Sequence, residues 1–90
     1  MDAERKEKIR QSLNHVHDWP SLYMFKFIVP TISDKFEALT KVFPGEIDLI
    51  TKQSSNGKYT SVTIKIVVID ADEVFRIHKE VSLIEGVISL

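Results

Sequence analysis

The stretch SNGKYTSVTIKIVVID, residues 55–70, decides the fold of this chain. Its Asn56-Gly57 pair favours a type I′ hairpin turn, because both residues tolerate the positive φ that such a turn demands. Apolar and polar residues alternate before this pair, over residues 46–53, and again after it. The stretch therefore predicts a β-hairpin whose two strands pair antiparallel.

The second strand of this hairpin is predicted to be long and central. From Val62 to Val68 every second residue is apolar, and Ser61, Thr63 and Lys65 fall on the opposite side, as in a strand with one buried face. Val67 and Ile69 make its end apolar on both sides, which predicts a strand that is covered on both faces there.

A further strand and a helix are predicted before the hairpin. Residues 22–29 alternate, and the row facing the core is the one that holds the rings, Tyr23, Phe25, Phe27 and Val29. Pro30 closes this strand. A helix follows over residues 34–43, because Ser33 or Asp34 can cap it, Glu37 stands at capping-box spacing from Asp34, and Pro44-Gly45 can end it.

The hairpin is followed by a second helix and a last strand. Asp70 and Glu73 form another capping box, and a helical apolar stripe runs from there to a stop at Gly86. Residues 87–90 are a short strand. At the other end of the chain, residues 2–14 are mixed-charge helix formers with a narrow apolar stripe of Ile9, Leu13 and Val16.

The order of these elements is β-α-β-β-α-β after an N-terminal helix, which fits few right-handed topologies. We predict an α+β, ferredoxin-like βαββαβ sandwich with a four-stranded antiparallel sheet in the order 4-1-3-2. Residues 1–18 would form a helical extension, and residues 19–90 the ferredoxin-like domain. Both crossover helices would cover one face of the sheet and leave the other open, unless the N-terminal helix lies across it.

Composition restricts the function classes. Ninety residues, 43% of them hydrophobic, supply one modest core, and the absence of cysteine removes disulfides, thiolate metal sites and cysteine nucleophiles. The net charge of −1 argues against a general nucleic-acid binder. The charged start lacks a secretory signal and no apolar run approaches the ~20 residues of a membrane span, so we expect a cytoplasmic protein without membrane contact.

Three chemical readings are disfavoured. The chain has no nucleophile motif and no glycine-rich phosphate loop, so we expect no enzyme, no catalytic residue and no cofactor. His15, His17 and Asp18 are predicted to lie in a solvated linker rather than to bind metal. The fold is shared with RNA-recognition motifs, but the open face would carry Ser61 and Thr63 where such domains place stacking rings.

The stretches WPSLYMFKFI and SNGKYTSVTIKIVV, together with the closing GVISL, resemble the YbeD-like family of small bacterial proteins of unknown function. The resemblance covers residues 19–90 and is most specific at Pro20, Phe25-Lys26, and Gly57-Lys58-Tyr59 followed by Ser61-Val62. It implies a fold similar to ACT regulatory domains, which pair sheet edges into dimers and bind amino acids where the first strand meets the first helix.

Two functions stay open. The first is a regulatory or ligand-sensing module, in which Thr31, Ser33 and Asp34 offer polar groups at the start of the first crossover helix. The second is a protein-interaction or self-association module, a homodimer included, that uses an edge strand or the open face. Its predicted surface is Met24, Lys26, Ile28, Ser61, Thr63, Lys65 and Val67.

Overall fold

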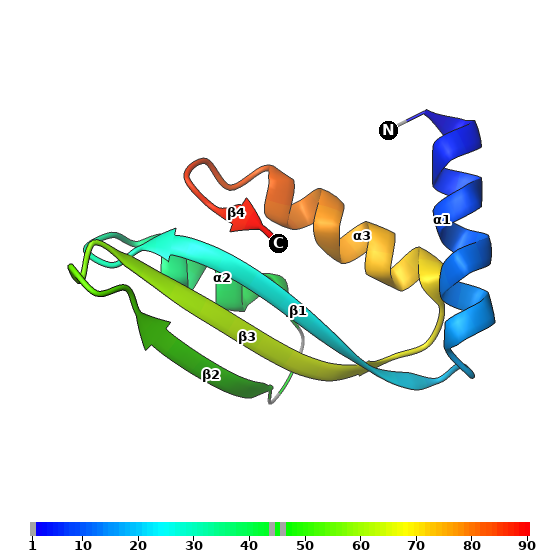
Figure 1. Cartoon of the computed structure of the whole chain (residues 1–90), viewed down its shortest axis with the longest axis horizontal. Coiled ribbons are helices and arrows are strands. Elements are labelled where there is room, and N and C mark those ends of the chain that lie inside the picture. The colour runs from blue at the N-terminus through cyan, green and yellow to red at the C-terminus, as the bar shows by residue number, and fades with distance from the viewer. Residues whose placement is uncertain (1, 44, 46) are drawn as a thin grey trace.

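A computed structural model describes residues 2–43, 45 and 47–90. Its four strands form one antiparallel sheet in the order β2-β3-β1-β4 (Figure 1), which confirms the predicted ferredoxin-like architecture. The elements are α1 (Ala3–Val16), β1 (Ser21–Pro30), α2 (Lys35–Val42), β2 (Asp48–Gln53), β3 (Tyr59–Val68), α3 (Ala71–Ser82) and β4 (Ile88–Ser89).

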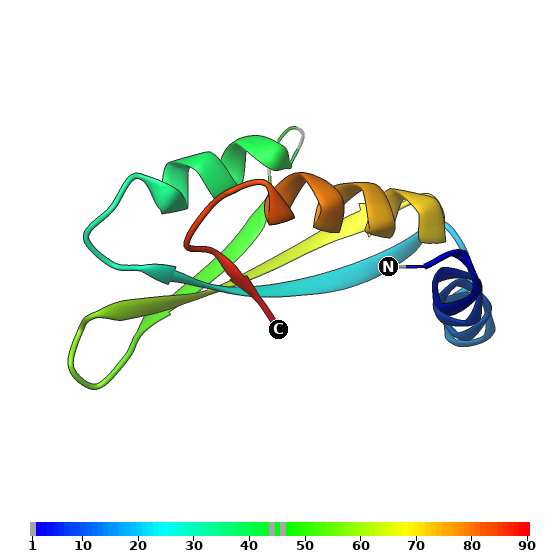
Figure 2. The same ribbon diagram turned by 90° about the horizontal axis from the view of Figure 1, so that it is seen from above.

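The core lies between one face of the sheet and the two helices α2 and α3, and Figure 2 shows both helices on the same side of the strands. Phe25 faces Ile64 across the central strand pair, and Phe27 faces Val62. All four of these side chains are at most 1% exposed. The inward direction predicted for the rings of β1 and the branched side chains of β3 is confirmed.

The β2–β3 hairpin is confirmed, but its predicted type I′ turn is wrong. No residue other than glycine has a positive φ in the described residues, so Asn56 does not adopt the left-handed conformation and only Gly57 does, at φ 72°. The amide of Gly57 donates to the carbonyl of Ser54, and the Asn56 side-chain oxygen accepts from the Ser54 hydroxyl and the Lys58 amide. This side chain stabilises a longer loop, in which one left-handed glycine suffices.

The end of β3 also differs from the prediction. Val67 and Ile69 are 63% and 62% exposed, so the strand is not covered on both faces there. Val68, by contrast, is fully buried in the core cluster together with residues of α2 and α3. The apolar run at the end of β3 therefore belongs to a strand that is buried on one face and exposed on the other.

The two crossover helices begin differently. The carboxylate of Asp70 accepts from the amide of Glu73, and the Glu73 carboxylate accepts from the amide of Ile69, which confirms a reciprocal cap at α3. At α2, by contrast, Asp34 makes no capping bond, and the Ser33 hydroxyl accepts from the Lys35 amide instead. The predicted capping box at α2 is wrong.

Some predicted boundaries also move. α3 ends at Ser82 rather than at Gly86, and β4 contains two residues rather than four. The predictions that Pro44 ends α2 and that a strand starts at Glu46 fall on positions outside the described residues.

Helix α1 does not cover the open face. It packs against α3, where Arg10 forms an ion pair with Asp72 and lies over the ring of Phe75. Figure 2 shows it at one end of the sheet, beyond the strands. Leu13 packs against the core cluster, whereas Met24, which a helix lying across the face would bury, remains 53% exposed. The alternative of a helix lying across the face is wrong.

Candidate functional site

The seven residues of the predicted interaction surface lie together on the sheet face opposite α2 and α3. Across the β1–β3 pair, Met24 lies opposite Lys65, Lys26 opposite Thr63 and Ile28 opposite Ser61. Val67 lies opposite Leu22 on the same face. We define the open face by the outward residues of all four strands: Leu22, Met24, Lys26, Ile28, Asp48, Ile50, Lys52, Tyr59, Ser61, Thr63, Lys65, Val67 and Ile88.

Apolar side chains on the open face are unusually accessible. Met24 and Val67 are 53% and 63% exposed, and Ile50 and Ile88 on the two edge strands are 57% and 54% exposed. Such side chains contribute little to stability where they are, since water still contacts more than half of each. Several of them on one face amount to the kind of patch that marks an interaction site.

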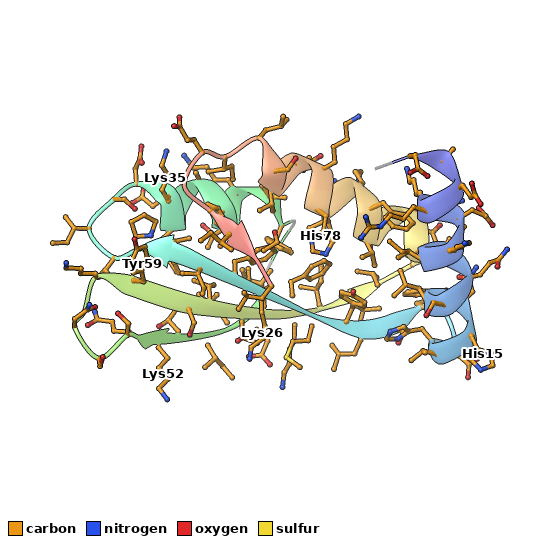
Figure 3. All side chains as sticks on the ribbon, turned by 45° about the horizontal axis from the view of Figure 1, so that its top comes forward. His15, Lys26, Lys35, Lys52, Tyr59 and His78 are labelled. Carbon is orange, nitrogen blue, oxygen red and sulfur yellow. The ribbon has the colours of Figure 1, made fainter. Side chains whose placement is uncertain are left out.

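Charge on the open face is predominantly positive. Among the described residues of the face, Lys26, Lys52 and Lys65 contribute three ammonium groups, and Asp48, opposite Lys65, contributes the one carboxylate. Figure 3 shows Lys26 and Lys52 directed away from the helices. The overall charge of the chain is −1, so this positive surface is a local feature that composition conceals.

The open face is also hollowed at the hairpin end. A shallow depression of about 220 Å³ lies beside Ile28, Lys52, Tyr59 and Ser61. It offers an apolar contact, an aromatic ring and a cation within one small area. Tyr59 is the aromatic residue of the open face, because the rings of Phe25 and Phe27 point into the core. A run of stacking rings, as used by RNA-binding sheets, is therefore not formed here.

The predicted ligand-binding residues lie in and beside the loop between β1 and α2. The hydroxyl of Thr31 is hydrogen bonded to that of Thr60 at 2.8 Å, and the Ser33 hydroxyl donates to the carbonyl of Pro30. Asp34 is exposed and makes no capping bond. The three residues are close in sequence, but two of the three side chains already have partners within the chain.

Histidines are dispersed over the structure. His17 is within hydrogen-bonding distance of the Ser21 hydroxyl and stacks on Trp19, whereas His78 packs against the Phe25 ring at a centroid distance of 5.3 Å. Burial lowers the pKa of His78 from its ordinary value. No cluster of metal-ligating side chains was found in the described part of the chain.

Sequence reasoning missed the contributions of β2 and β4 to the open face. Ile50, Lys52 and Ile88 were absent from the predicted surface, as was Leu22 of β1, although alternation within β1 and β2 already put Leu22, Ile50 and Lys52 on the outward side. What sequence could not supply was the register that brings Ile50 beside Thr63 and Ile88 beside Ile28. Only with that register do separate exposed residues become one surface.

Comparison with known proteins identifies the family. The model of the family described as "Protein of unknown function (DUF493)" matches residues 14–90. The chain belongs to this family. The match starts near the end of α1 and includes all strands of the sheet, so the family relationship concerns the ferredoxin-like part of the chain.

Curated relatives agree with this assignment and confirm the YbeD-like resemblance. A UPF0250 protein of Shewanella baltica is 36% identical over 74 residues, covering 78% of this chain and 84% of the relative. A UPF0250 protein of Shewanella oneidensis is 30% identical over 83 residues, covering 88% of this chain and 94% of the relative. In this member of the family, no helix within residues 2–43, 45 and 47–90 is long and apolar enough to cross a membrane.

Proposed function

We propose that this protein is a non-enzymatic regulatory module that docks on a partner protein through the open face of its sheet. The observation that carries the proposal is the accessible apolar row flanked by lysines, which no element of the chain covers in the described residues. Loss of contact between this row and water is the source of affinity, and the lysines select the partner.

The chemistry of the face favours a partner with an apolar patch ringed by carboxylates. Lys26 lies near the middle of the face, between Met24 and Ile28 on the same strand. If a second copy docked face to face, these ammonium groups would approach one another and repel, whereas aspartate or glutamate side chains of another protein would pair with them. A hetero-partner is therefore favoured over a homodimer.

Affinity capture with matched variants tests this proposal. The purified chain is immobilised, an extract of its own cells is passed over it, and the retained protein is identified and purified. We expect Lys26→Glu/Lys65→Glu to weaken its binding at least about tenfold, because two attractive contacts become repulsive. Both lysines are solvent-facing, so circular dichroism should show an unchanged fold.

The control is Lys8→Glu/Lys41→Glu, which makes the same change of charge at exposed positions of α1 and α2. It should bind the partner as the wild type does. Equal loss in both double variants would mean that net charge, not the open face, governs binding and would contradict the proposal. Light scattering that shows a dimer dissolved by Ile88→Glu would instead identify self-association as the function of this face.

Ligand sensing is the second candidate, favoured by the exposed carboxylate of Asp34, which makes no capping bond. A ligand with an ammonium group, such as an amino acid, would pair with it beside the Ser33 hydroxyl. A thermal-shift screen of amino acids should then raise the melting temperature with saturation, and Asp34→Ala should abolish the increase. A flat screen would remove this candidate without affecting the first.

A further inference from the structure

The outer edge of β1 is only partly covered. β4 pairs with Phe27 and Ile28, and the amide of Leu90 donates to the carbonyl of Lys26. Toward the start of β1 no strand of the described residues pairs with it on this side. Residues 21–25 therefore have no strand partner at this edge, although the His17 ring lies 5.5 Å from that of Tyr23.

Backbone groups at this edge point outward. In an antiparallel sheet the peptide groups of successive residues face alternate sides. Because the backbone carbonyl of Lys26 points toward β4, the backbone N–H and C=O groups of Met24 and Leu22 point to the same side, beyond the end of β4. These groups form a template for one more strand, which would lie about 4.8 Å from β1.

The space beside this edge is an apolar groove of about 400 Å³. Side chains of α1 and α3 line it, together with Tyr23 of β1. Burial lowers the pKa of His78, so at neutral pH its imidazole is uncharged and belongs to the apolar lining. The residues that line the groove are Ile9, Leu13, Tyr23, Val74, Phe75, His78 and Ser89.

Positive charge lies at one end of the groove. Phe75 and His78 also line an adjoining hollow of about 500 Å³, together with Lys6, Lys79 and Ser82. The Lys6 ammonium lies 5.1 Å from the centre of the Phe75 ring, and neither lysine has an ion-pair partner within the described residues. Arg10, nearby, is already paired with Glu7 and Asp72. Lys6 and Lys79 are therefore the cations of this hollow that can still pair with a carboxylate of a partner.

From this geometry we infer a second binding site: an extended peptide segment of a partner protein adds to β1 as a strand in line with β4. Main-chain hydrogen bonds join it to Met24 and Leu22, and one apolar side chain enters the groove beside Phe75. An aspartate or glutamate of the peptide reaches Lys6 and Lys79. The site is separate from the open face and does not depend on the function proposed for it.

Selection from a random peptide library, with the intact chain as bait, tests this site. We expect apolar and polar residues to alternate in the selected peptides, and each peptide to contain at least one acidic residue. A synthetic copy of the strongest peptide then serves as the probe in fluorescence anisotropy. Lys6→Glu/Lys79→Glu should weaken its affinity at least about tenfold, and Lys26→Glu/Lys52→Glu, a matched change on the open face, should alter it by less than about twofold.

Amide hydrogen exchange distinguishes strand addition from other modes of binding. The bound peptide should slow exchange at the amides of Leu22 and Met24, which face the empty edge. A peptide that binds without protecting them, that binds both double variants equally, or that fails to be enriched over bare resin would overturn the inference. Because the open-face variants are the control here, failure of one site leaves the other independently testable.

Discussion

The two faces of the β1–β3 pair belong to the same strands, but one is buried and the other is exposed to water. On the covered face, Phe25 and Ile64 are almost completely buried beneath α2 and α3. On the open face, the adjacent residues Met24 and Lys65 are in contact with water. Residues that are adjacent in the chain therefore differ in how much apolar area they bury, since successive side chains of a strand point to opposite faces.

This contrast separates stability from recognition. Burial of apolar area stabilises the fold only where the area leaves water, so the covered face should dominate the free energy of unfolding. Apolar side chains on the open face gain this free energy only when a partner covers them. Substitutions of adjacent residues can test this division directly.

The largest difference in stability is expected between two variants that place a carboxylate on opposite faces of β3. Val68→Asp puts a carboxylate into the core without a partner and should lower the free energy of unfolding by at least about 4 kcal/mol, enough to unfold most of the protein. Val67→Asp, one residue earlier and 63% exposed, should remain folded. Circular dichroism of both variants checks this, and similar unfolding in both would break the distinction between the faces.

Removal of a ring should have the next largest effect. Phe25→Ala leaves a cavity beside Phe43 and His78 and should cost about 3–5 kcal/mol in urea denaturation. Met24→Ala, on the other face, should cost less than about 1 kcal/mol, because this side chain is half exposed. Comparable losses for the two would indicate that the open face is covered in solution.

The helix caps above the covered face should differ by a smaller amount. Asp70→Ala removes the bond to the Glu73 amide and should cost about 1 kcal/mol. Asp34→Ala removes no capping bond, so its unfolding midpoint should stay close to that of the wild type. If Asp34→Ala were as destabilising as Asp70→Ala, the carboxylate would have to cap α2 in solution.

The smallest effect on stability is expected from acidification, which protonates His78 on the covered side of the sheet. Burial lowers its pKa in the folded state, so the unfolded chain binds a proton first as the pH falls. Stability from this group is fully present above the unfolded value of about 6.5 and decreases as the pH falls through the folded pKa. Urea midpoints at pH 7.5 and 5.5 should therefore decrease more for the wild type than for His78→Gln, and parallel decreases would exclude His78 as the cause.

Much of the covered face could be predicted from sequence. Its alternating rings in β1 and branched residues in β3 carry a period of two, and such periodicity assigns a strand and a buried side without knowledge of its neighbours. The reciprocal cap at Asp70 and Glu73 was equally readable, because both partners lie within four residues. The ligand-sensing role of Thr31, Ser33 and Asp34 stays a prediction.

Predictions were wrong where a short sequence pattern is compatible with more than one structure. Asn56-Gly57 marked the hairpin correctly, but Asn56 used its side chain to organise a longer loop. Val67 and Ile69 were apolar without being covered, because apolarity of a strand does not reveal whether a second layer exists. α1 had a readable stripe, yet only packing placed it against α3 instead of the open face.

The sequence by itself determined the order of elements, the hairpin and the side of each central strand that enters the core, because these follow from spacings of two to four residues. Tertiary structure alone decided that β2 and β4 extend the open face and that α1 packs against α3 rather than across that face. These features depend on register and docking between segments distant in sequence, and the energies that fix them belong to no single stretch of the chain.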